Sequence, residues 1–289
     1  MNLPLKLGIE KTGIANGELN HPWGIAFDSK NQHVIVSDKN NHRLQSFDRQ
    51  HLTHHSTVGS YGSNLGQLDS PSGLCLQPQT DQLLVCDWGN HRVQVLSAQS
   101  QPTKLIGSGQ SSEVNYPFGV CCSPDGSLAV TEWNNCRVQR FDATGRFLST
   151  FGSEGRGESQ FKYPYDLCHL HHHFAPSSSA SSLLLVTDWS NKRLSIWSAD
   201  GRQHLTNIKM NGNVRGLCVD LNGFVYASCQ SQHVVCIYDP RKSYQLLQTL
   251  GGEQGSAPGQ FYFPTGMCVD DLNTLMVVDC GNHRVQFFD

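Results

Sequence analysis

Short apolar runs separated by polar turns follow one another along the whole chain. One repeating unit reads GIAFD at 24–28, HVIVSD at 33–38 and RLQSF at 43–47, and another unit adds a fourth run, RFLST, at 146–150. The runs are rich in β-branched and aromatic residues, and Gly, Asn, Asp and Pro separate them. Such runs are typical of short β-strands. No window shows the sustained 3.6-residue apolar period of a helix.

The chain contains six of these units, at residues 19–48, 68–97, 114–142, 161–198, 211–239 and 261–289. Five of them carry a proline near the start, and the remaining unit has Val214 there; the prolines are Pro22, Pro71, Pro117, Pro164 and Pro264. A repeat length in the forties indicates a propeller or a helical solenoid, and strand-like runs favour the propeller. We therefore expect an all-β, six-bladed β-propeller of four-stranded antiparallel blades. It should form a single domain over residues 1–289, with a loop insertion at about 170–182.

The two ends of the sequence predict how the ring closes. The last unit stops after its third run, RVQFFD, and residues Leu3 to Gly8 resemble the fourth run that precedes the sixth unit. We therefore expect this N-terminal segment to supply the outer strand of the last blade, which would leave no unpaired strand edge there.

A polar phrase at the start of the third run carries a family resemblance. It stands as Asn41-His42-Arg43-Leu44, Asn90-His91-Arg92-Val93 and Asn282-His283-Arg284-Val285, and the sequence therefore resembles the NHL-repeat family. The fifth unit departs most, since SCQSQHVVCIYD at 228–239 lacks the acid and the arginine. The resemblance implies a recognition propeller. Such propellers often select substrates for RING-bearing tripartite-motif ubiquitin ligases, several bind single-stranded RNA, and a peptide-amidating lyase uses the same fold.

Composition narrows the possible partners and the compartment. A net charge of −3 gives the chain no general attraction for nucleic acid or anionic membrane, no apolar run approaches a membrane span, and the first residues lack the apolar stretch of a secretory signal. A cytoplasmic protein is expected.

Five of the eleven cysteines occupy one repeat position, which holds Ala26 in the first unit and should be a small buried site: Cys75, Cys121, Cys168, Cys218 and Cys268. No CxxC pair occurs, so we expect no RING within the chain.

An acid ends the second run and an arginine begins the third in five units. These residues are Asp38, Asp87, Glu132, Asp188 and Asp279, with Arg43, Arg92, Arg137, Arg193 and Arg284. Turn formation and acid–arginine pairing explain them best; a ring of carboxylates that binds a cation over the channel is the alternative.

The in-register His42, His91 and His283 should be structural, whereas His169 and His171–His173 lie beside the insertion and could bind metal adventitiously. With no catalytic motif found, we expect no enzyme and no cofactor.

Aromatic residues mark the candidate binding face. Three tryptophans directly follow the acid, in the turn between the second and third strands, and Trp23 follows the first motif proline. Both kinds of loop emerge on one face of a propeller, where Tyr and Trp serve as anchors. The predicted apolar anchors are Trp23, Trp88, Phe118, Trp133, Tyr165 and Trp189, and the predicted cationic contacts are Lys39, Lys162, Lys192 and Arg215. We expect a monomeric domain that binds a protein or peptide, with single-stranded RNA as the alternative and no membrane partner.

Overall fold

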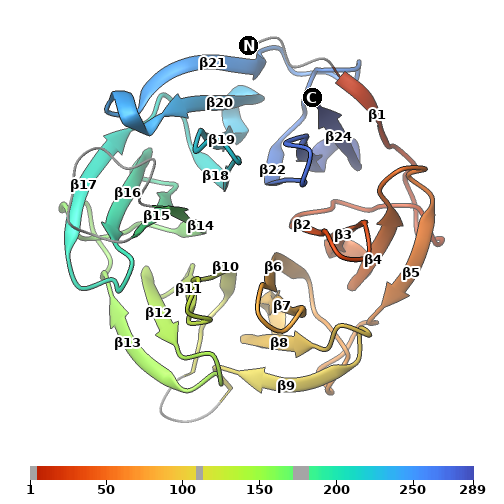
Figure 1. Ribbon diagram of the computed structural model, residues 1–289, viewed down its shortest axis with the longest axis horizontal. Helices are drawn as coiled ribbons and strands as arrows, with labels where there is room; N and C mark the ends of the chain where they lie inside the picture. The colour runs from red at the N-terminus through yellow and green to blue at the C-terminus, as the bar shows by residue number, and fades with distance from the viewer. Residues whose placement is uncertain (1–4, 109–112, 172–181) are drawn as a thin grey trace.

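The computed structural model describes residues 5–108, 113–171 and 182–289. They form six four-stranded antiparallel sheets, arranged like blades around a central channel (Figure 1). Blade 1 is β2-β3-β4-β5, blade 2 is β6-β7-β8-β9 and blade 3 is β10-β11-β12-β13, whereas blade 4 is β14-β15-β16-β17, blade 5 is β18-β19-β20-β21 and blade 6 is β22-β23-β24-β1. The prediction of a six-bladed propeller is confirmed.

The strands are short, as their apolar runs predicted. Those of blades 1 to 3 are β2 Ile25–Asp28, β3 His33–Asp38, β4 Arg43–Asp48, β5 His54–Val58, β6 Pro71–Gln77, β7 Gln82–Asp87, β8 Arg92–Leu96, β9 Pro102–Ile106, β10 Pro117–Cys122, β11 Leu128–Glu132, β12 Arg137–Phe141 and β13 Phe147–Phe151. Those of blades 4 to 6 are β14 Pro164–His171, β15 Ser182–Asp188, β16 Arg193–Ser198, β17 His204–Lys209, β18 Val214–Val219, β19 Val225–Cys229, β20 Val234–Asp239, β21 Gln245–Gly251, β22 Pro264–Val269, β23 Leu275–Asp279, β24 Arg284–Phe288 and β1 Leu5–Ile9. The described helices are single 3-10 turns: η1 Lys39–Asn41, η2 Trp88–Asn90, η4 Gln230–Gln232, η5 Pro240–Lys242 and η6 Cys280–Asn282.

The N-terminal strand closes the ring. Strand β1 pairs antiparallel with β24, with Leu5 opposite Phe288 and Ile9 opposite Val285, and Ile9 is buried in the core beside β24. This confirms the predicted closure, although the strand runs to Ile9 and the first two residues of the predicted segment lie outside the described part. The predicted insertion at about 170–182 also falls almost wholly outside the described residues.

The core lies between blades rather than in one central mass. In one cluster Leu84 and Val95 of blade 2 pack with Val120 and Val130 of blade 3. Because each blade packs against a neighbouring blade on both faces of its sheet, the side chains on both faces of its middle strands are buried. This explains why all five residues of β8 are buried, whereas the outer strand β13 leaves Phe147 and Leu148 exposed.

Glycines let the innermost strands approach one another closely. Five glycines, one at the start of each inner strand, would place a Cβ within 1.9 to 2.7 Å of a carbonyl oxygen of the next blade: Gly24, Gly73, Gly119, Gly216 and Gly266. Blade 4 has Asp166 at this position instead. At this joint the Thr187 hydroxyl lies 3.2 Å from the Arg215 carbonyl, compared with 2.7 Å for the matching bond from Ser228 to Thr265. The Asp166 carboxylate instead bridges blades 4 and 5, because it accepts the Leu217 N–H at 2.9 Å.

The repeated acid and arginine form a buried pair in each of five blades. Arg43 Nε lies 2.7 Å from Asp38, and the pairs of Arg92 with Asp87, Arg193 with Asp188 and Arg284 with Asp279 are all 2.8 Å long; Arg137 pairs with Glu132 in the same way. All five carboxylates have no exposed surface. The prediction of acid–arginine pairing is confirmed, and the alternative, a carboxylate ring binding a cation, is wrong because the arginines neutralise the acids.

The same pairs fix the loops that enter each first strand. The Asp87 carboxylate also accepts the Asp69 N–H at 2.7 Å, and Arg92 donates to the carbonyls of Ser63, Asn64 and Gln67. Histidines then join neighbouring blades, since Nδ1 of His42, His91 and His283 accepts the N–H of Ser70, Tyr116 and His21, respectively, at 3.0 to 3.2 Å. The structural role predicted for these histidines is confirmed.

Candidate ligand-binding face

Two sets of loops meet at one end of the channel. The turns after the second strands place Lys39, Trp88, Trp133 and Trp189 there. The entries to the first strands add Trp23, Phe118, Tyr165 and Arg215. We call these eight residues, together with Tyr116 and Tyr163, the aromatic face. The buried acid–arginine pairs hold both sets of loops, so the face is built on a rigid support.

Three rings form the centre of the aromatic face. The Phe118 ring centroid lies 4.5 Å from that of Tyr165 and 5.0 Å from that of Trp23, and Trp23 and Tyr165 stack at 6.1 Å. Phe118 is 5% exposed and Tyr165 is 8% exposed, whereas Trp23 is partly exposed. Phe118 and Tyr165 were predicted as ligand anchors of the same kind as the tryptophans. In the structure they form the floor on which Trp23 rests, so only Trp23 of the three presents a wide surface.

Two cations lie over these rings. Lys39 Nζ is 4.7, 4.9 and 5.1 Å from the centroids of Trp23, Trp88 and Phe118. The Arg215 guanidinium carbon is 4.8 Å from Trp23, 4.8 Å from Tyr165 and 5.9 Å from Trp189. Such contacts contribute about 0.5 to 2 kcal/mol each, depending on how far the cation is desolvated.

Neither cation has an acidic partner in the described ranges. Burial is the main cause that lowers the pKa of Lys39 to about 8, with Arg215 lowering it further and Cys280 and Asp69 opposing the shift. Burial likewise lowers the pKa of Arg215, and its Nε is covered and has no acceptor among the described residues. The face thus carries two partly exposed positive charges that have no counter-ion among the described residues.

An outer arc of rings continues across blades 2 to 4. Trp88 lies 4.7 Å from Tyr116, Tyr116 lies 6.4 Å from Trp133, and Trp133 stacks on Tyr163 at 4.7 Å. Tyr163 in turn lies 6.4 Å from Trp189. The ring contacts therefore pass from blade to blade, and all five rings remain partly exposed.

Lys162 and Lys192 lie on the blade 4 loops but take no part in this stacking. The Lys162 N–H donates to Asp188 at 2.7 Å, and Lys192 is exposed with a left-handed φ of 52°. Of the four predicted cations, the structure joins Lys39 and Arg215 to the rings and places no ring of the described residues under the other two. Their role as ligand contacts stays a prediction.

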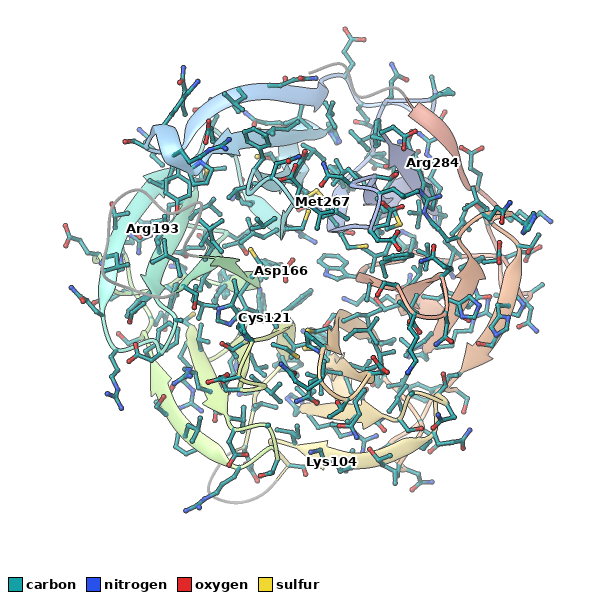
Figure 2. The ribbon with its side chains drawn as sticks, viewed as in Figure 1. Lys104, Cys121, Asp166, Arg193, Met267 and Arg284 are labelled. Atoms are coloured by element: carbon teal, nitrogen blue, oxygen red, sulfur yellow. The ribbon has the colours of Figure 1, made fainter. Side chains whose placement is uncertain are left out.

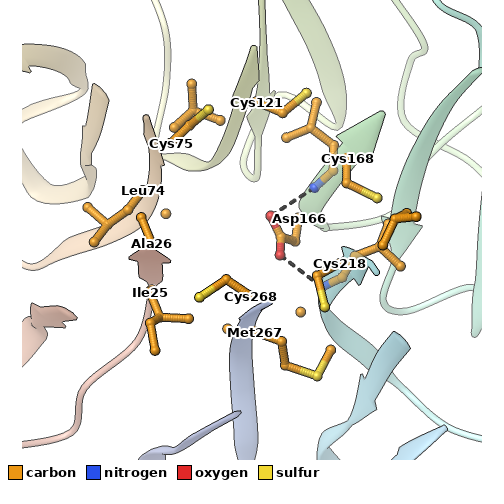
Figure 3. A pocket seen from close by; sticks show the side chains of 18 of the residues that line it. Ile25, Ala26, Leu74, Cys75, Cys121, Asp166, Cys168, Cys218, Met267 and Cys268 are labelled. Carbon is orange, nitrogen blue, oxygen red and sulfur yellow. Dashed lines mark hydrogen bonds between the residues drawn. The ribbon is translucent and has the colours of Figure 1, made fainter. Parts of the chain in front are cut away.

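Beneath the floor lies a channel cavity of about 500 Å³. Figure 2 places Cys121, Asp166 and Met267 around this channel, with Arg193 and Arg284 farther out among the strands. Figure 3 shows Asp166 facing the cavity, where its carboxylate accepts the N–H groups of Leu167 and Leu217, both at 2.9 Å. Burial raises the pKa of Asp166 to about 7, against the lowering effect of these two bonds.

The five repeat cysteines line this same cavity (Figure 3). Cys121 and Cys218 are buried as predicted, but Cys75, Cys168 and Cys268 are partly exposed toward the channel. The small-residue position therefore lines the channel and also packs against the core clusters between blades. The sequence reasoning gave Asp166 no role, although its interruption of the glycine series was the available signal.

Metal-binding and membrane features are not seen in the described ranges. There, no three or more His, Cys, Asp or Glu side chains gather in an arrangement that could hold a metal ion. Of the predicted histidine cluster, His169 lines the channel, and His172 and His173 lie outside the described part. No described helix is long and apolar enough to cross a membrane.

The comparison with known sequence families supplies the decisive match. The NHL repeat matches residues 19–47, 68–96 and 261–288, which belong to blades 1, 2 and 6. Three of the six blades are NHL repeats. The matched segments are those that contain the Asn-His-Arg phrase, whereas blade 5, without acid or arginine, is not among them.

Sequence relatives of the NHL propeller cover only a part of it. Over 65 residues it is 34% identical to RING finger protein nhl-1 of Caenorhabditis elegans, which spans 22% of this chain and 7% of that protein. Over 56 residues it is 41% identical to the protein brain tumor of Drosophila melanogaster, which spans 19% of this chain and 5% of that protein. The matched region is thus a small fraction of either relative.

Solved structures share the fold over nearly the whole chain. A streptogramin B lyase superposes with a TM-score of 0.67 at 10% identity, covering 100% of this chain and 98% of that one. An inactive virginiamycin B lyase of Staphylococcus aureus with quinupristin superposes with a TM-score of 0.66 at 12% sequence identity, covering 99% of each chain. Hydrazine synthase of Kuenenia stuttgartiensis superposes with a TM-score of 0.63 at 16% sequence identity, covering 96% of this chain and 77% of that one. At these identities the likeness shows the fold alone.

Proposed function

We propose that this NHL propeller is a non-catalytic recognition module that binds a segment of a partner protein on its aromatic face. The observation that carries the proposal is the set of four partly exposed tryptophans held on rigid turns at one end of the channel: Trp23, Trp88, Trp133 and Trp189. Aromatic side chains dominate binding energy at protein interfaces, and a preformed arrangement lowers the entropic cost of binding.

A non-catalytic role is supported by how the polar groups around the face are used. The five acids are neutralised by their arginines, and the ring Nδ1 atoms of the repeat histidines accept backbone N–H groups. These side chains are occupied by the architecture and are not arranged as a nucleophile with its base. The eleven free thiols suit a reducing compartment, which supports the proposal of a cytoplasmic protein.

A place in ubiquitin-ligase machinery would suit a recognition module of this kind. One relative is named a RING finger protein, and the expected lack of a RING in this chain means that the catalytic part would be supplied elsewhere. We therefore propose that the aromatic face selects the protein to be ubiquitinated.

Single-stranded RNA is the second candidate ligand. The stacking of Lys39 and Arg215 on aromatic rings favours it, because unpaired bases stack on such surfaces. The small number of cations at the rings and the net charge of −3 support RNA less well than a protein segment.

Affinity capture with matched variants tests the proposal. The immobilised chain should retain specific proteins from nuclease-treated lysate. Trp133→Ala should lose them because it removes an exposed anchor, whereas Leu246→Ala, on the outer strand β21, should keep them. Recovery of RNA instead of protein, or identical capture by both variants, would contradict the proposal. The melting temperature of each variant shows whether the propeller is intact.

A further inference from the structure

We propose that Lys39 and Arg215 form an anion pocket at the channel mouth that binds a side-chain carboxylate of an acidic segment in the partner protein. This inference rests on the proposed function and names the chemistry that the aromatic face selects. No other described residue supplies the missing negative charge, and the ring contacts that hold the two cations define where the carboxylate would lie.

The contrast with the other arginines shows that these two cations are unusual. Five blade arginines each pair with a buried acid, and the more exposed Arg241 pairs with Asp239 at 2.8 Å. Lys39 and Arg215 have rings around them and no carboxylate or carbonyl acceptor within the described ranges. Buried charges are ordinarily paired, because their desolvation is otherwise uncompensated.

The two charges share one aromatic ring. Both stand over the Trp23 ring, at 4.7 and 4.8 Å, and Arg215 contributes to the lowered pKa of Lys39. Two like charges that share one indole repel each other, and this repulsion is unfavourable in the free protein. A single bound carboxylate would relieve it for both.

The surrounding side chains define the shape of the pocket. Trp88 and Phe118 flank the Lys39 ammonium, Tyr165 and Trp189 flank the Arg215 guanidinium, and Trp23 contacts both. A guanidinium offers a planar fork that matches a carboxylate, while an ammonium acts as a compact point charge. The rings around both exclude water and strengthen the attraction for an anion.

The nearest acid does not fill this role. Asp69 is close enough to Lys39 to affect its pKa, but its carboxylate lies 3.3 Å from His42 and accepts the Ser70 hydroxyl at 3.0 Å. Cys280, which borders both cations, has its pKa raised to about 11 by burial, so it is a neutral thiol at pH 7. The counter-ion must therefore come from a ligand.

A carboxylate fits the pocket better than a nucleic acid backbone. Strong binding of a nucleic acid requires many cations along a track of phosphates, whereas two cations of the described residues contact the rings of the aromatic face. In addition, Phe118 and Tyr165 are buried and engaged with neighbouring rings, so they offer no open face to a base. One acidic side chain flanked by apolar residues satisfies both the charges and the surrounding tryptophans.

Fluorescence anisotropy with two matched peptide panels tests the proposal. The labelled hexapeptides are identical apart from two central positions, which are glutamate in one panel and glutamine in the other, and an oligouridylate serves as the RNA probe. Wild type should bind glutamate peptides at least tenfold more tightly than their glutamine counterparts. Lys39→Met and Arg215→Met should each abolish this preference, and Arg215→Lys should weaken it while keeping the charge.

The controls are Lys242→Met and Arg202→Met, which remove exposed cations away from the aromatic face and should leave the preference unchanged. Equal binding of the two panels by wild type overturns the inference. If that equal binding is lost in Trp133→Ala, the proposed function survives the failure of the carboxylate pocket. Binding of oligouridylate that depends on Lys39 and Arg215, without a glutamate preference, overturns it in favour of RNA.

Discussion

Replacement of Lys39 by methionine should make the protein more stable and its binding weaker. Methionine keeps the length of the side chain and fits irregular apolar space, but it removes the buried charge. The lowering of the pKa of Lys39 from 10.5 to about 8 corresponds to about 3 kcal/mol of destabilisation while the group is charged in the folded state. Cation–π contacts with the rings offset up to about 2 kcal/mol of this destabilisation. We therefore expect Lys39→Met to raise the free energy of unfolding by about 1 kcal/mol at pH 7.

The pH dependence gives this prediction a second readout. Below pH 8 the folded and unfolded states both hold the proton, so the cost of the buried charge is present in full. Between pH 8 and 10.5 only the unfolded state keeps it, and the wild type gains stability relative to the variant as pH rises. The advantage of Lys39→Met should therefore shrink across this range. The groups that face Lys39 are Arg215, Asp69 and Cys280, and burial raises the pKa of Cys280 to about 11.

Urea denaturation at pH 7, 8, 9 and 10 measures the difference, with Lys242→Met as the exposed control that should change stability little. The reasoning would be refuted if Lys39→Met lowered the free energy of unfolding by more than about 1 kcal/mol at pH 7. It would also be refuted if the difference in stability between variant and wild type did not vary with pH. Lys39 would then be a structural residue whose ring contacts outweigh its desolvation.

Three further predictions test the fold that supports the face. Arg92→Met, which leaves the Asp87 carboxylate buried and unpaired, should cost about 3 to 5 kcal/mol of stability, whereas Arg241→Met, at a more exposed pair, should cost less than about 1 kcal/mol; equal losses in urea denaturation would contradict the structural role of the pairs. Ile9→Ala should cost about 2 to 5 kcal/mol because β1 closes the ring, and a loss near zero would contradict the closure. Asp166→Asn should remove a pH dependence of stability, because the pKa of this acid is raised to about 7 in the folded state. The stability of the wild type relative to the variant should therefore fall between pH 4 and pH 7. Thermal melts that show no such change would refute this prediction.

The blade architecture could be predicted from the sequence because each of its determinants is local and repeated. The Asn-His-Arg phrase, the preceding acid and the motif proline fix one turn in every copy, and the repeat length then gives the number of blades. The N-terminal strand could be placed because its residues resemble the fourth run before the sixth unit.

The candidate site could be predicted only in part, because it depends on contacts between blades. The repeat register placed Trp23, Lys39 and Arg215 on one face but could not show that both cations share the Trp23 ring. It also gave Phe118 the same role as the tryptophans, whereas packing from neighbouring blades buries this ring. The role of Asp166 was missed because it depends on an N–H of the next blade.

The central claim is that partners bind at the aromatic face, and site-specific crosslinking tests it most directly. A benzophenone amino acid can replace the exposed Asn40 in η1 on this face, or Leu272 in the hairpin between β22 and β23, which is 79% exposed and lies at the opposite ends of the strands. After irradiation with a bound glutamate peptide, position 40 should give the adduct, and position 272 should give none. Adducts from position 272, or equal yields from the two positions, would contradict the account.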